Sequence, residues 1–299
     1  MNNFWIFQYG QGALIRNNYG FSSIHSWTNL GDNPVEYHLE SIKNNTPTTL
    51  AKKSLYYLKL DSESRINSKK LFTIETINKY LTLHDESSIR SFLKKDSSKI
   101  SQIKIKISSD TFESKLINEF TQFNGSIIFD CNATFNYNDF INFWGSLSEN
   151  IKNKVIYIED PCPYSKDIWS ELNSKNIPLA FDFYGNSEIN DFYKVRVLKP
   201  KIQDCQHIIP LEQSKNRNIC ITSMFDNPFG VSITAFEYLN LKNKYPDISF
   251  ETPGLNCPRN KNFDDFYDII FSKDFEFNAP DDFGFGFTEQ LEKLKWKKL

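Results

Sequence analysis

The chain has 299 residues, enough for one large barrel and a small additional domain, and 39% of them are hydrophobic, which permits a sizeable core. Its 35 basic and 37 acidic residues leave a formal charge of -2, which gives no electrostatic argument for nucleic acid or an anionic membrane as a partner. Five cysteines without a C-x-x-C pair argue against a disulfide framework or a structural zinc site. Since no segment resembles a membrane span or a signal peptide, we expect a cytoplasmic protein.

The first 78 residues show no regular repeat and predict an α+β capping domain. Short apolar runs with glycines between them, from residue 5 to residue 27, are typical of antiparallel strands. Residues 34–60 carry apolar side chains at helical spacing, interrupted by a loop that contains a proline. We expect the C-terminal tail, residues 265–299, to pack back onto this domain.

Between residues 79 and 264 a strand pattern alternates with a helix pattern. Eight candidate strands recur at roughly the 25–30-residue interval that one β/α unit of a parallel barrel requires. They are Tyr80–Leu83, Ile103–Ile107, Ser126–Asp130, Val155–Glu159, Pro178–Asp182, Val195–Lys199, Asn218–Thr222 and Asp247–Glu251. The alternation predicts an α/β fold with a parallel barrel as the second domain.

Five of these runs end on a charged residue, in the order Lys, Asp, Glu, Asp and Lys. The residues are Lys106, Asp130, Glu159, Asp182 and Lys199. The C-terminal ends of the strands are the face of a parallel barrel that carries catalytic groups, so these side chains are predicted to share one site. Singly, each has an ordinary explanation, as a solvated strand edge or a helix N-cap, but the ordered set favours a common role.

The pattern of charges also indicates a chemistry. Three carboxylates without a neighbouring histidine ligand favour Mg²⁺, with Mn²⁺ as the alternative. A lysine on either side suits removal of a proton next to a carboxylate, while the second ammonium stabilises the enediolate. We therefore expect a small-molecule carboxylate as the partner of a monomer or small homo-oligomer, and neither nucleic acid nor a membrane.

The sequence around these charges carries motifs of a known family. They are Lys104-Ile105-Lys106, Asp130-Cys131-Asn132, Ile158-Glu159-Asp160-Pro161, Asp182 and Leu198-Lys199-Pro200. In these motifs the chain resembles the enolase superfamily, its muconate-lactonizing-enzyme group and, within that group, the o-succinylbenzoate synthases. The resemblance implies a modified TIM barrel, (β/α)7β, with an N-terminal α+β capping domain. It is weaker over residues 1–78, where Gly20–Ser26 takes the place of the family's specificity loop.

The resemblance also implies a role for each strand-final charge. Lys106 would be the base that removes the proton α to the carboxylate, and the Lys199 ammonium would face the opposite side of the substrate. The Mg²⁺ ligands would be Asp130, Glu159 and Asp182.

Three further residues would support this machinery. Lys104 would assist Lys106 and bind the substrate carboxylate, Asn132 would contact the metal ligands or a metal-bound water, and Ser223 would be another carboxylate contact. For a synthase of this kind the reaction is a lysine-assisted syn-elimination of water. It converts 2-succinyl-6-hydroxy-2,4-cyclohexadiene-1-carboxylate into o-succinylbenzoate for menaquinone biosynthesis.

Two loops depart from the family's pattern and leave the substrate open. Phe183–Gly185 follows Asp182, and Met224–Pro228 follows Ser223, at positions that line the family's substrate pocket. The same two lysines would also serve an N-acylamino-acid racemase or a dipeptide epimerase. A third hypothesis is a non-catalytic ligand-binding barrel, against which the retained lysines and carboxylates count. The four histidines fit no ligand spacing.

Overall fold

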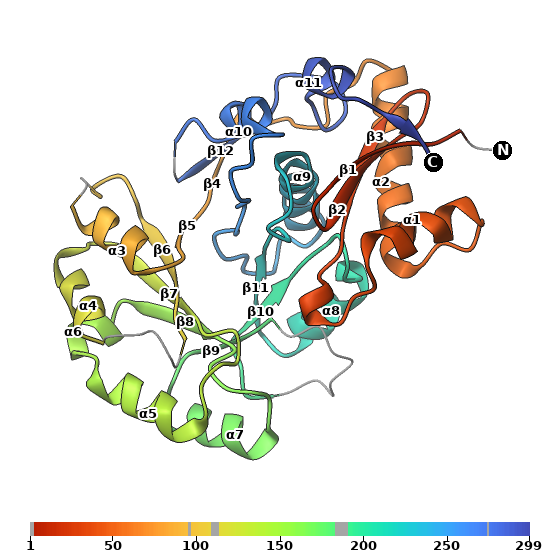
Figure 1. Ribbon diagram of the computed structural model, residues 1–299. Helices are drawn as coiled ribbons and strands as arrows, with labels where there is room; N and C mark the ends of the chain where they lie inside the picture. The colour runs from red at the N-terminus through yellow and green to blue at the C-terminus, as the bar shows by residue number, and fades with distance from the viewer. Residues whose placement is uncertain (1–2, 95–96, 109–113, 183–190, 274) are drawn as a thin grey trace.

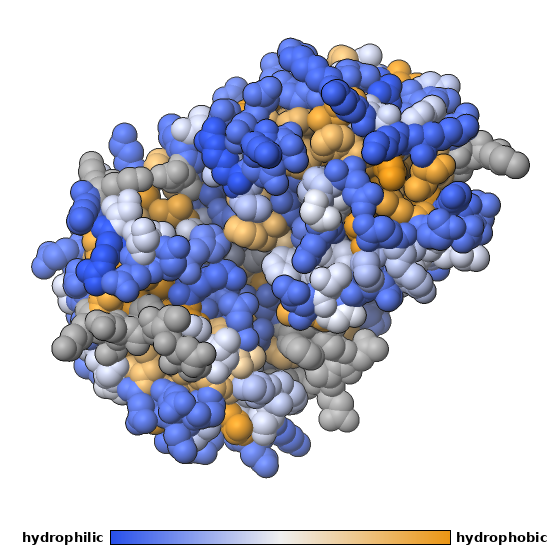
Figure 2. All heavy atoms as spheres, viewed as in Figure 1, coloured by the Kyte–Doolittle hydropathy of each residue, from blue (hydrophilic) through white to orange (hydrophobic). Residues whose placement is uncertain are grey.

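A computed structural model describes the chain except residues 1–2, 95–96, 109–113, 183–190 and 274. It shows a parallel barrel beside a smaller layer of N-terminal elements, in which Trp5–Tyr9 pairs with Lys297–Lys298 from the other end of the chain (Figure 1). The predicted fold class, an α/β barrel with an N-terminal α+β cap, is confirmed. Hydrophilic residues cover most of the face shown in Figure 2, and hydrophobic residues reach it only in small patches.

We call the N-terminal layer the cap. It contains an antiparallel sheet of strand order β13-β1-β2-β3. Its elements are β1 (Trp5–Tyr9), β2 (Gly12–Arg16), β3 (Phe21–His25), the 3-10 helix η1 (Thr28–Leu30), α1 (Val35–Lys43), α2 (Thr49–Ile66) and β13 (Lys297–Lys298). The α2 helix packs against β3, and β2 and β3 are therefore buried along almost their whole length.

The segment after residue 263 runs back over the cap. Its elements are α10 (Asp264–Ile270), β12 (Glu276–Asn278), which pairs with β4 (Thr76–Asn78), and α11 (Thr288–Glu292). The buried carboxylate of Asp61 in α2 accepts hydrogen bonds from the backbone N–H groups of Phe21, at 2.8 Å, and Phe285, at 2.7 Å. Gly284 has a φ of +58°, and a Cβ there would lie 2.0 Å from Oδ1 of Asp61, so glycine is required at this close approach.

Seven of the eight predicted strands form one parallel sheet in sequence order. They are β5 (Leu81–Leu83), β6 (Gln102–Lys106), β7 (Ser126–Asp130), β8 (Val155–Glu159), β9 (Leu179–Phe181), β10 (Val195–Leu198) and β11 (Asn218–Ile221). The register pairs Lys106 with Asp130, and Asp130 with Glu159. Three of the strand-final charges therefore lie side by side.

Helices cover the outside of this sheet, because alternate strand residues such as Ile103 and Ile105 point outward into an apolar core shared with Phe92 and Phe120. The helices are α3 (Glu86–Leu93), α4 (Ser114–Asn118), η2 (Glu119–Gln122), α5 (Tyr137–Ser146), α6 (Glu149–Lys152), α7 (Lys166–Ser174), α8 (Cys205–Ser214) and α9 (Pro228–Lys244). In the described part of the chain, no helix has both the length and the apolarity that crossing a membrane requires.

The prediction of a regular eighth strand over Asp247–Glu251 is wrong, because the structure forms no continuous strand there. This segment makes a single bridge to β11, between Ile219 and Phe250, and a second isolated bridge follows it, between Thr222 and Gly254. Its other edge meets the start of β5, where the N–H of Tyr80 donates to the carbonyl of Pro253 at 3.4 Å. Because proline has no N–H to donate, an irregular segment closes the barrel in place of a full ladder.

Candidate active site

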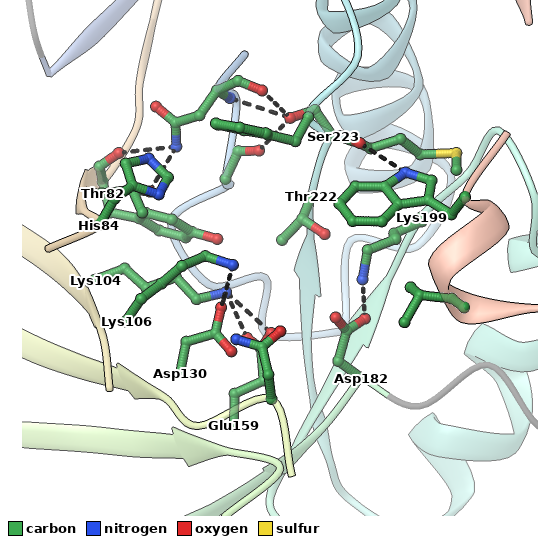
Figure 3. A pocket seen from close by; sticks show the side chains of 18 residues that line it. Thr82, His84, Lys104, Lys106, Asp130, Glu159, Asp182, Lys199, Thr222 and Ser223 are labelled. Atoms are coloured by element: carbon green, nitrogen blue, oxygen red, sulfur yellow. Dashed lines mark hydrogen bonds and ion pairs between the residues drawn. The ribbon is translucent and has the colours of Figure 1, made fainter. Parts of the chain in front are cut away.

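A pocket of about 150 Å³ opens at the C-terminal ends of the barrel strands, and Figure 3 shows the side chains that line it. All eight predicted site residues line this pocket. They are Lys104, Lys106, Asp130, Asn132, Glu159, Asp182, Lys199 and Ser223. Trp27 and Leu30 close it from the cap side. The structure therefore brings the sequence-predicted residues together in one cavity between barrel and cap.

Lys104 is the buried cation of the site. It follows Ile103 in β6, so the alternation along the strand directs it toward the barrel mouth when Ile103 points outward. Its Nζ lies 3.0 Å from Oδ2 of Asp130 and 2.8 Å from Oε2 of Glu159. Burial disfavours the ammonium, but these two carboxylates hold the pKa of Lys104 well above its usual value. Lys104 is therefore a fixed positive charge.

The carboxylates respond differently to this environment. Burial and the nearby charge of Asp130 raise the pKa of Glu159 well above its usual value. Burial acts in the same direction on Asp130, but Lys104 and Lys106 outweigh it and lower the pKa of Asp130. Negative charge is therefore crowded at Glu159, and a further cation beside it would relieve the repulsion.

Lys106 and Lys199 approach the pocket from opposite sides (Figure 3). The Nζ of Lys106 lies 3.6 Å from Oδ2 of Asp130, and 38% of this side chain is exposed. The Lys199 side chain is 11% exposed, and its Nζ forms an ion pair with Asp182. The Lys199 backbone N–H donates to the side-chain carbonyl of Gln203 at 2.6 Å, which anchors the turn after β10.

The donor set fits a hard divalent metal, although its oxygens are not gathered around one point. Asp130, Glu159 and Asp182 line one pocket and supply only oxygen donors, as Mg²⁺ and Mn²⁺ prefer. Within the described ranges, no group of three Asp, Glu, His or Cys residues is arranged to hold a metal ion. The ammonium groups of Lys104 and Lys199 lie against these carboxylates instead. Lys199 and a metal ion would therefore compete for the carboxylate of Asp182.

Asn132 and Ser223 occupy the pocket wall in different ways. Asn132 is exposed and follows β7 with a φ of 47°, a left-handed conformation that asparagine tolerates. The Ser223 hydroxyl lies within hydrogen-bonding distance of the carbonyls of Gly254, at 3.1 Å, and Asn256, at 2.5 Å, and it accepts the N–H of Asn256. In this structure Ser223 joins the end of β11 to the closing segment.

Several pocket residues were missed from the sequence. His84 directly follows β5 and lines the pocket, with its ring centroid 5.1 Å from that of Phe225. The signal was its position, because it directly follows a strand, close to the level at which Lys106 and Asp130 end theirs. Asn256 and Trp27 gave no such signal. Of the two loops that depart from the family's pattern, 183–185 lies outside the described residues, whereas Met224 and Phe225 line the pocket.

The expected specificity loop has a different structure. Most of Gly20–Ser26 belongs to β3, and the cap reaches the pocket through Trp27 and Leu30. The indole N–H of Trp27 donates to the carbonyl of Met224 at 3.0 Å. The pocket wall from the cap is therefore bonded directly to the pocket wall from the barrel.

Comparisons with known proteins relate the chain to a family and a fold. A family model described as the N-terminal domain of O-succinylbenzoate synthase matches residues 7–64. The chain is 27% identical over 293 residues to an o-succinylbenzoate synthase from Bdellovibrio bacteriovorus, covering 94% of this chain and 87% of that relative. A mandelate racemase/muconate lactonizing protein from Herpetosiphon aurantiacus superposes with a TM-score of 0.68 at 12% identity, covering 96% of this chain and 95% of that one.

A member of the enolase superfamily from Listeria innocua gives the same TM-score of 0.68 at 10% identity, covering 100% of this chain and 98% of that chain. The structural matches show the fold, and the sequence relative is an o-succinylbenzoate synthase to which the chain is similar over most of its length. The predicted resemblance to the enolase superfamily and to its o-succinylbenzoate synthases is confirmed, as is the prediction of an enzyme of the lyase type.

Proposed function

We propose that this chain, a relative of the o-succinylbenzoate synthases with the fold of the enolase superfamily, is a metal-dependent dehydratase of the menaquinone pathway in the cytoplasm. Its substrate would be 2-succinyl-6-hydroxy-2,4-cyclohexadiene-1-carboxylate and its product o-succinylbenzoate. One observation carries the proposal: Lys106 and Lys199 stand on opposite sides of a pocket that also holds three carboxylates. The sequence relative supports the choice of substrate.

Lys106 is the proposed base. Its partial exposure within the pocket leaves its Nζ accessible to a bound substrate. In its neutral form the amine takes the proton from the carbon α to the carboxylate, and the electron pair moves into that carboxylate as an enediolate. The resulting ammonium then donates the proton to the departing β-hydroxyl on the same face. Water leaves and the ring becomes aromatic, so one residue acts as base and then as acid, as a syn-elimination needs.

The remaining charges are proposed to stabilise the enediolate. Lys199 stays protonated and approaches the substrate from the side opposite Lys106, where its charge favours the developing anion. Enzymes of the enolase superfamily generally use a divalent metal. Mg²⁺ held by Asp130, Glu159 and Asp182 would supply Lewis-acid stabilisation of the same charge.

The supporting residues follow from the contacts of the site. Lys104 would balance the buried charges of Asp130 and Glu159 and add positive potential for the substrate carboxylate. Asn132 would contact one of the metal-binding carboxylates or a water bound to the metal. Ser223 would contact the carboxylate only after exchanging its present backbone partners.

The proposed domains are consecutive along the chain. Residues 1–78 form the capping domain, residues 79–264 form the catalytic barrel, and the tail 265–299 packs on the cap. Because Trp27 and Leu30 close the pocket, a small carboxylate would be enclosed between the two domains. Enclosure limits the access of water to the enediolate.

The test is a dehydration assay with the cyclohexadiene substrate, followed by the ultraviolet absorbance of the aromatic product. We expect Lys106→Ala and Lys199→Ala each to lower kcat by roughly 10²–10⁴-fold. The matched control is Lys43→Ala, which removes an exposed lysine of α1 and should retain full activity. Near-wild-type turnover by Lys106→Ala would refute its role, and a wild-type protein without dehydration activity would refute the function.

A second function is favoured by the same pair of lysines. Two amines on opposite faces of one carbon can remove a proton and return it to the other face, as in an N-acylamino-acid racemase or a dipeptide epimerase. Incorporation of solvent deuterium at the α carbon of an N-acylamino acid, without loss of water, would identify this activity. Failure to bind Mg²⁺ and to turn over either substrate would leave a non-catalytic ligand-binding barrel.

A further inference from the structure

A buried ion pair beside the pocket joins three parts of the molecule. Lys201 follows β10, Asp226 precedes α9, and Ser23 lies in β3 of the cap. The Nζ of Lys201 forms an ion pair with the carboxylate of Asp226 and donates a hydrogen bond of 2.7 Å to Oγ of Ser23. The side chains of Lys201 and Asp226 are 2% and 0% exposed. One ammonium group therefore connects two barrel loops with the cap sheet.

We propose that the Lys201–Asp226 pair is a positioning device that holds the cap against the barrel, completes the pocket wall and thereby sets the affinity for substrate. The proposal rests on the proposed function, because the affinity concerned is that for the cyclohexadiene carboxylate substrate. Neither residue lines the pocket, so both act through their neighbours.

The first argument is the position of each partner in the chain. Lys201 is two residues beyond Lys199, and Asp226 directly follows Phe225 of the pocket wall. Met224, one residue earlier, accepts the hydrogen bond of Trp27. The pair therefore fixes two barrel loops that carry pocket residues, and Ser23 fixes the strand that leads to Trp27.

The second argument is that the pair belongs to a set of polar links between the cap and the same two loops. Within the cap, the Ser54 hydroxyl of α2 donates to the carbonyl of Ser23 in β3 at 2.9 Å, so the strand that meets Lys201 is itself bonded to α2. The Tyr57 hydroxyl of α2 donates to the carbonyl of Pro200 at 3.4 Å. Asn227, next to Asp226, donates its side-chain amide to the hydroxyl of Tyr9 in β1. Strands β1 and β3 and helix α2 are thus all tied to the loops after β10 and β11.

The third argument is energetic. A buried ion pair often contributes less to stability than an apolar pair of similar volume, because desolvation offsets the attraction. Here Oδ1 of Asp226 has no hydrogen-bond partner among the described residues, which adds to that cost. The carboxylate also fills the space above the first turn of α9, where a Cβ at Gly230 would lie 1.9 Å from Oδ2 of Asp226. Holding the cap in one orientation on the barrel therefore explains this pair better than a gain in folding stability does.

The test removes both charges together, because a single substitution would leave an unpaired buried charge and weaken folding. In Lys201→Met/Asp226→Asn we expect KM for the cyclohexadiene substrate to rise about tenfold, which is the loss of roughly one well-formed contact. We expect kcat to change by less than about threefold. The lost contacts would weaken the binding of substrate and transition state equally, and the catalytic groups remain.

Hydrogen exchange measured by peptide supplies a readout that does not depend on turnover. Peptides covering residues 26–31 and 224–228 should exchange faster in the double variant, while those covering β6, β7 and β8 keep the wild-type rate. The matched control is Lys70→Met/Asp281→Asn, the same substitutions in an ion pair whose side chains are 52% and 89% exposed. It should leave KM and exchange unchanged.

Wild-type KM and wild-type exchange in the double variant would overturn the proposal. Faster exchange spread evenly over the barrel strands would also overturn it, because the pair would then be a general structural contact. If the wild-type protein does not dehydrate the substrate, the proposed function fails, yet the exchange comparison still decides whether the pair couples cap and barrel.

Discussion

The Nζ of Lys104 lies 2.8 Å from Oε2 of Glu159, with both side chains almost fully buried. The first lysine of the Lys-x-Lys motif is therefore a counterion for the carboxylates. The second lysine, Lys106, carries the accessible amine. Residues two apart on a strand point to the same face, so the two lysines of the motif differ in depth: the Lys104 side chain is buried and that of Lys106, at the end of β6, is partly exposed.

Replacing Lys104 is expected to destabilise the protein. Lys104→Met removes the cation that Asp130 and Glu159 share and leaves buried carboxylates unpaired, so the free energy of unfolding should fall by about 3–5 kcal/mol. Urea denaturation in EDTA measures the change. Lys43→Met, at an exposed position of α1, is the control and should stay within about 0.5 kcal/mol of wild type. An equally small effect for Lys104→Met would mean that the carboxylates do not depend on it.

Asp160 is expected to make stability depend on pH. Burial and the neighbouring Asp182 raise the pKa of Asp160 from 3.8 to about 7. Because the folded state binds this proton more tightly than the unfolded state, protonation of Asp160 favours folding. Its contribution to the free energy of unfolding is complete below pH 4 and is lost as the pH rises through 7. Asp160→Asn should therefore match wild type at pH 4 and be more stable at pH 8, by at most about 4 kcal/mol.

Urea denaturation of the metal-free protein at the two pH values measures this difference. Asparagine tolerates the left-handed φ of 41° at this position, so the substitution preserves the backbone. Asp247→Asn, at an exposed position, is the control. A stability difference between Asp160→Asn and wild type that is the same at both pH values would contradict the prediction.

Removal of divalent metal is expected to abolish dehydration, and addition of Mg²⁺ or Mn²⁺ to restore it. Asp182→Asn should weaken Mg²⁺ binding by at least about tenfold, because it removes one of three charged oxygen donors. Calorimetric titration without substrate measures this affinity independently of turnover. The exposed Asp247→Asn should bind like wild type. Unchanged affinity in Asp182→Asn would exclude Asp182 as a ligand.

Closure of the barrel is expected to depend on a glycine. A Cβ at Gly254 would lie 2.0 Å from the hydroxyl oxygen of Tyr80, so Gly254→Ala must displace Tyr80 and should destabilise the protein by about 1–3 kcal/mol. Gly145 in α5 has open space around its Cβ position, and Gly145→Ala should stabilise by about 0.5–1 kcal/mol. Thermal unfolding of both variants measures the contrast. Equal shifts would show that Gly254 is not crowded.

The sequence was sufficient to locate the strands that carry the charges. Strands β7 and β8 begin and end at the predicted residues, because each is a short apolar run closed by an ionisable side chain. The eighth strand is reduced to isolated bridges: Glu251 and Gly254 donate to the strand beside them, but Pro253 between them has no N–H with which to continue the ladder. Periodicity describes side chains and does not report which backbone groups find partners.

In the site, too, some residues follow from local sequence patterns and others do not. The strand-final charges were predictable because the ends of parallel strands converge on one face. His84 obeys that rule, although its spacing from the other histidines does not indicate a site. The contact between Trp27 and Met224 joins residues 197 positions apart, and no local pattern encodes such a distance. The cap side of the pocket therefore required the structure.

The ion pair between Lys199 and Asp182 has a consequence for how the site would be loaded. Because Lys199 binds Oδ1 of Asp182, a dication that used both oxygens of this carboxylate would weaken the ion pair. A substrate carboxylate that attracts Lys199 would expose Asp182, and a cation at Asp182 would free Lys199 for the substrate. By reciprocity the two bindings would then reinforce each other by an equal factor, which makes cofactor and substrate cooperative partners in assembling the site.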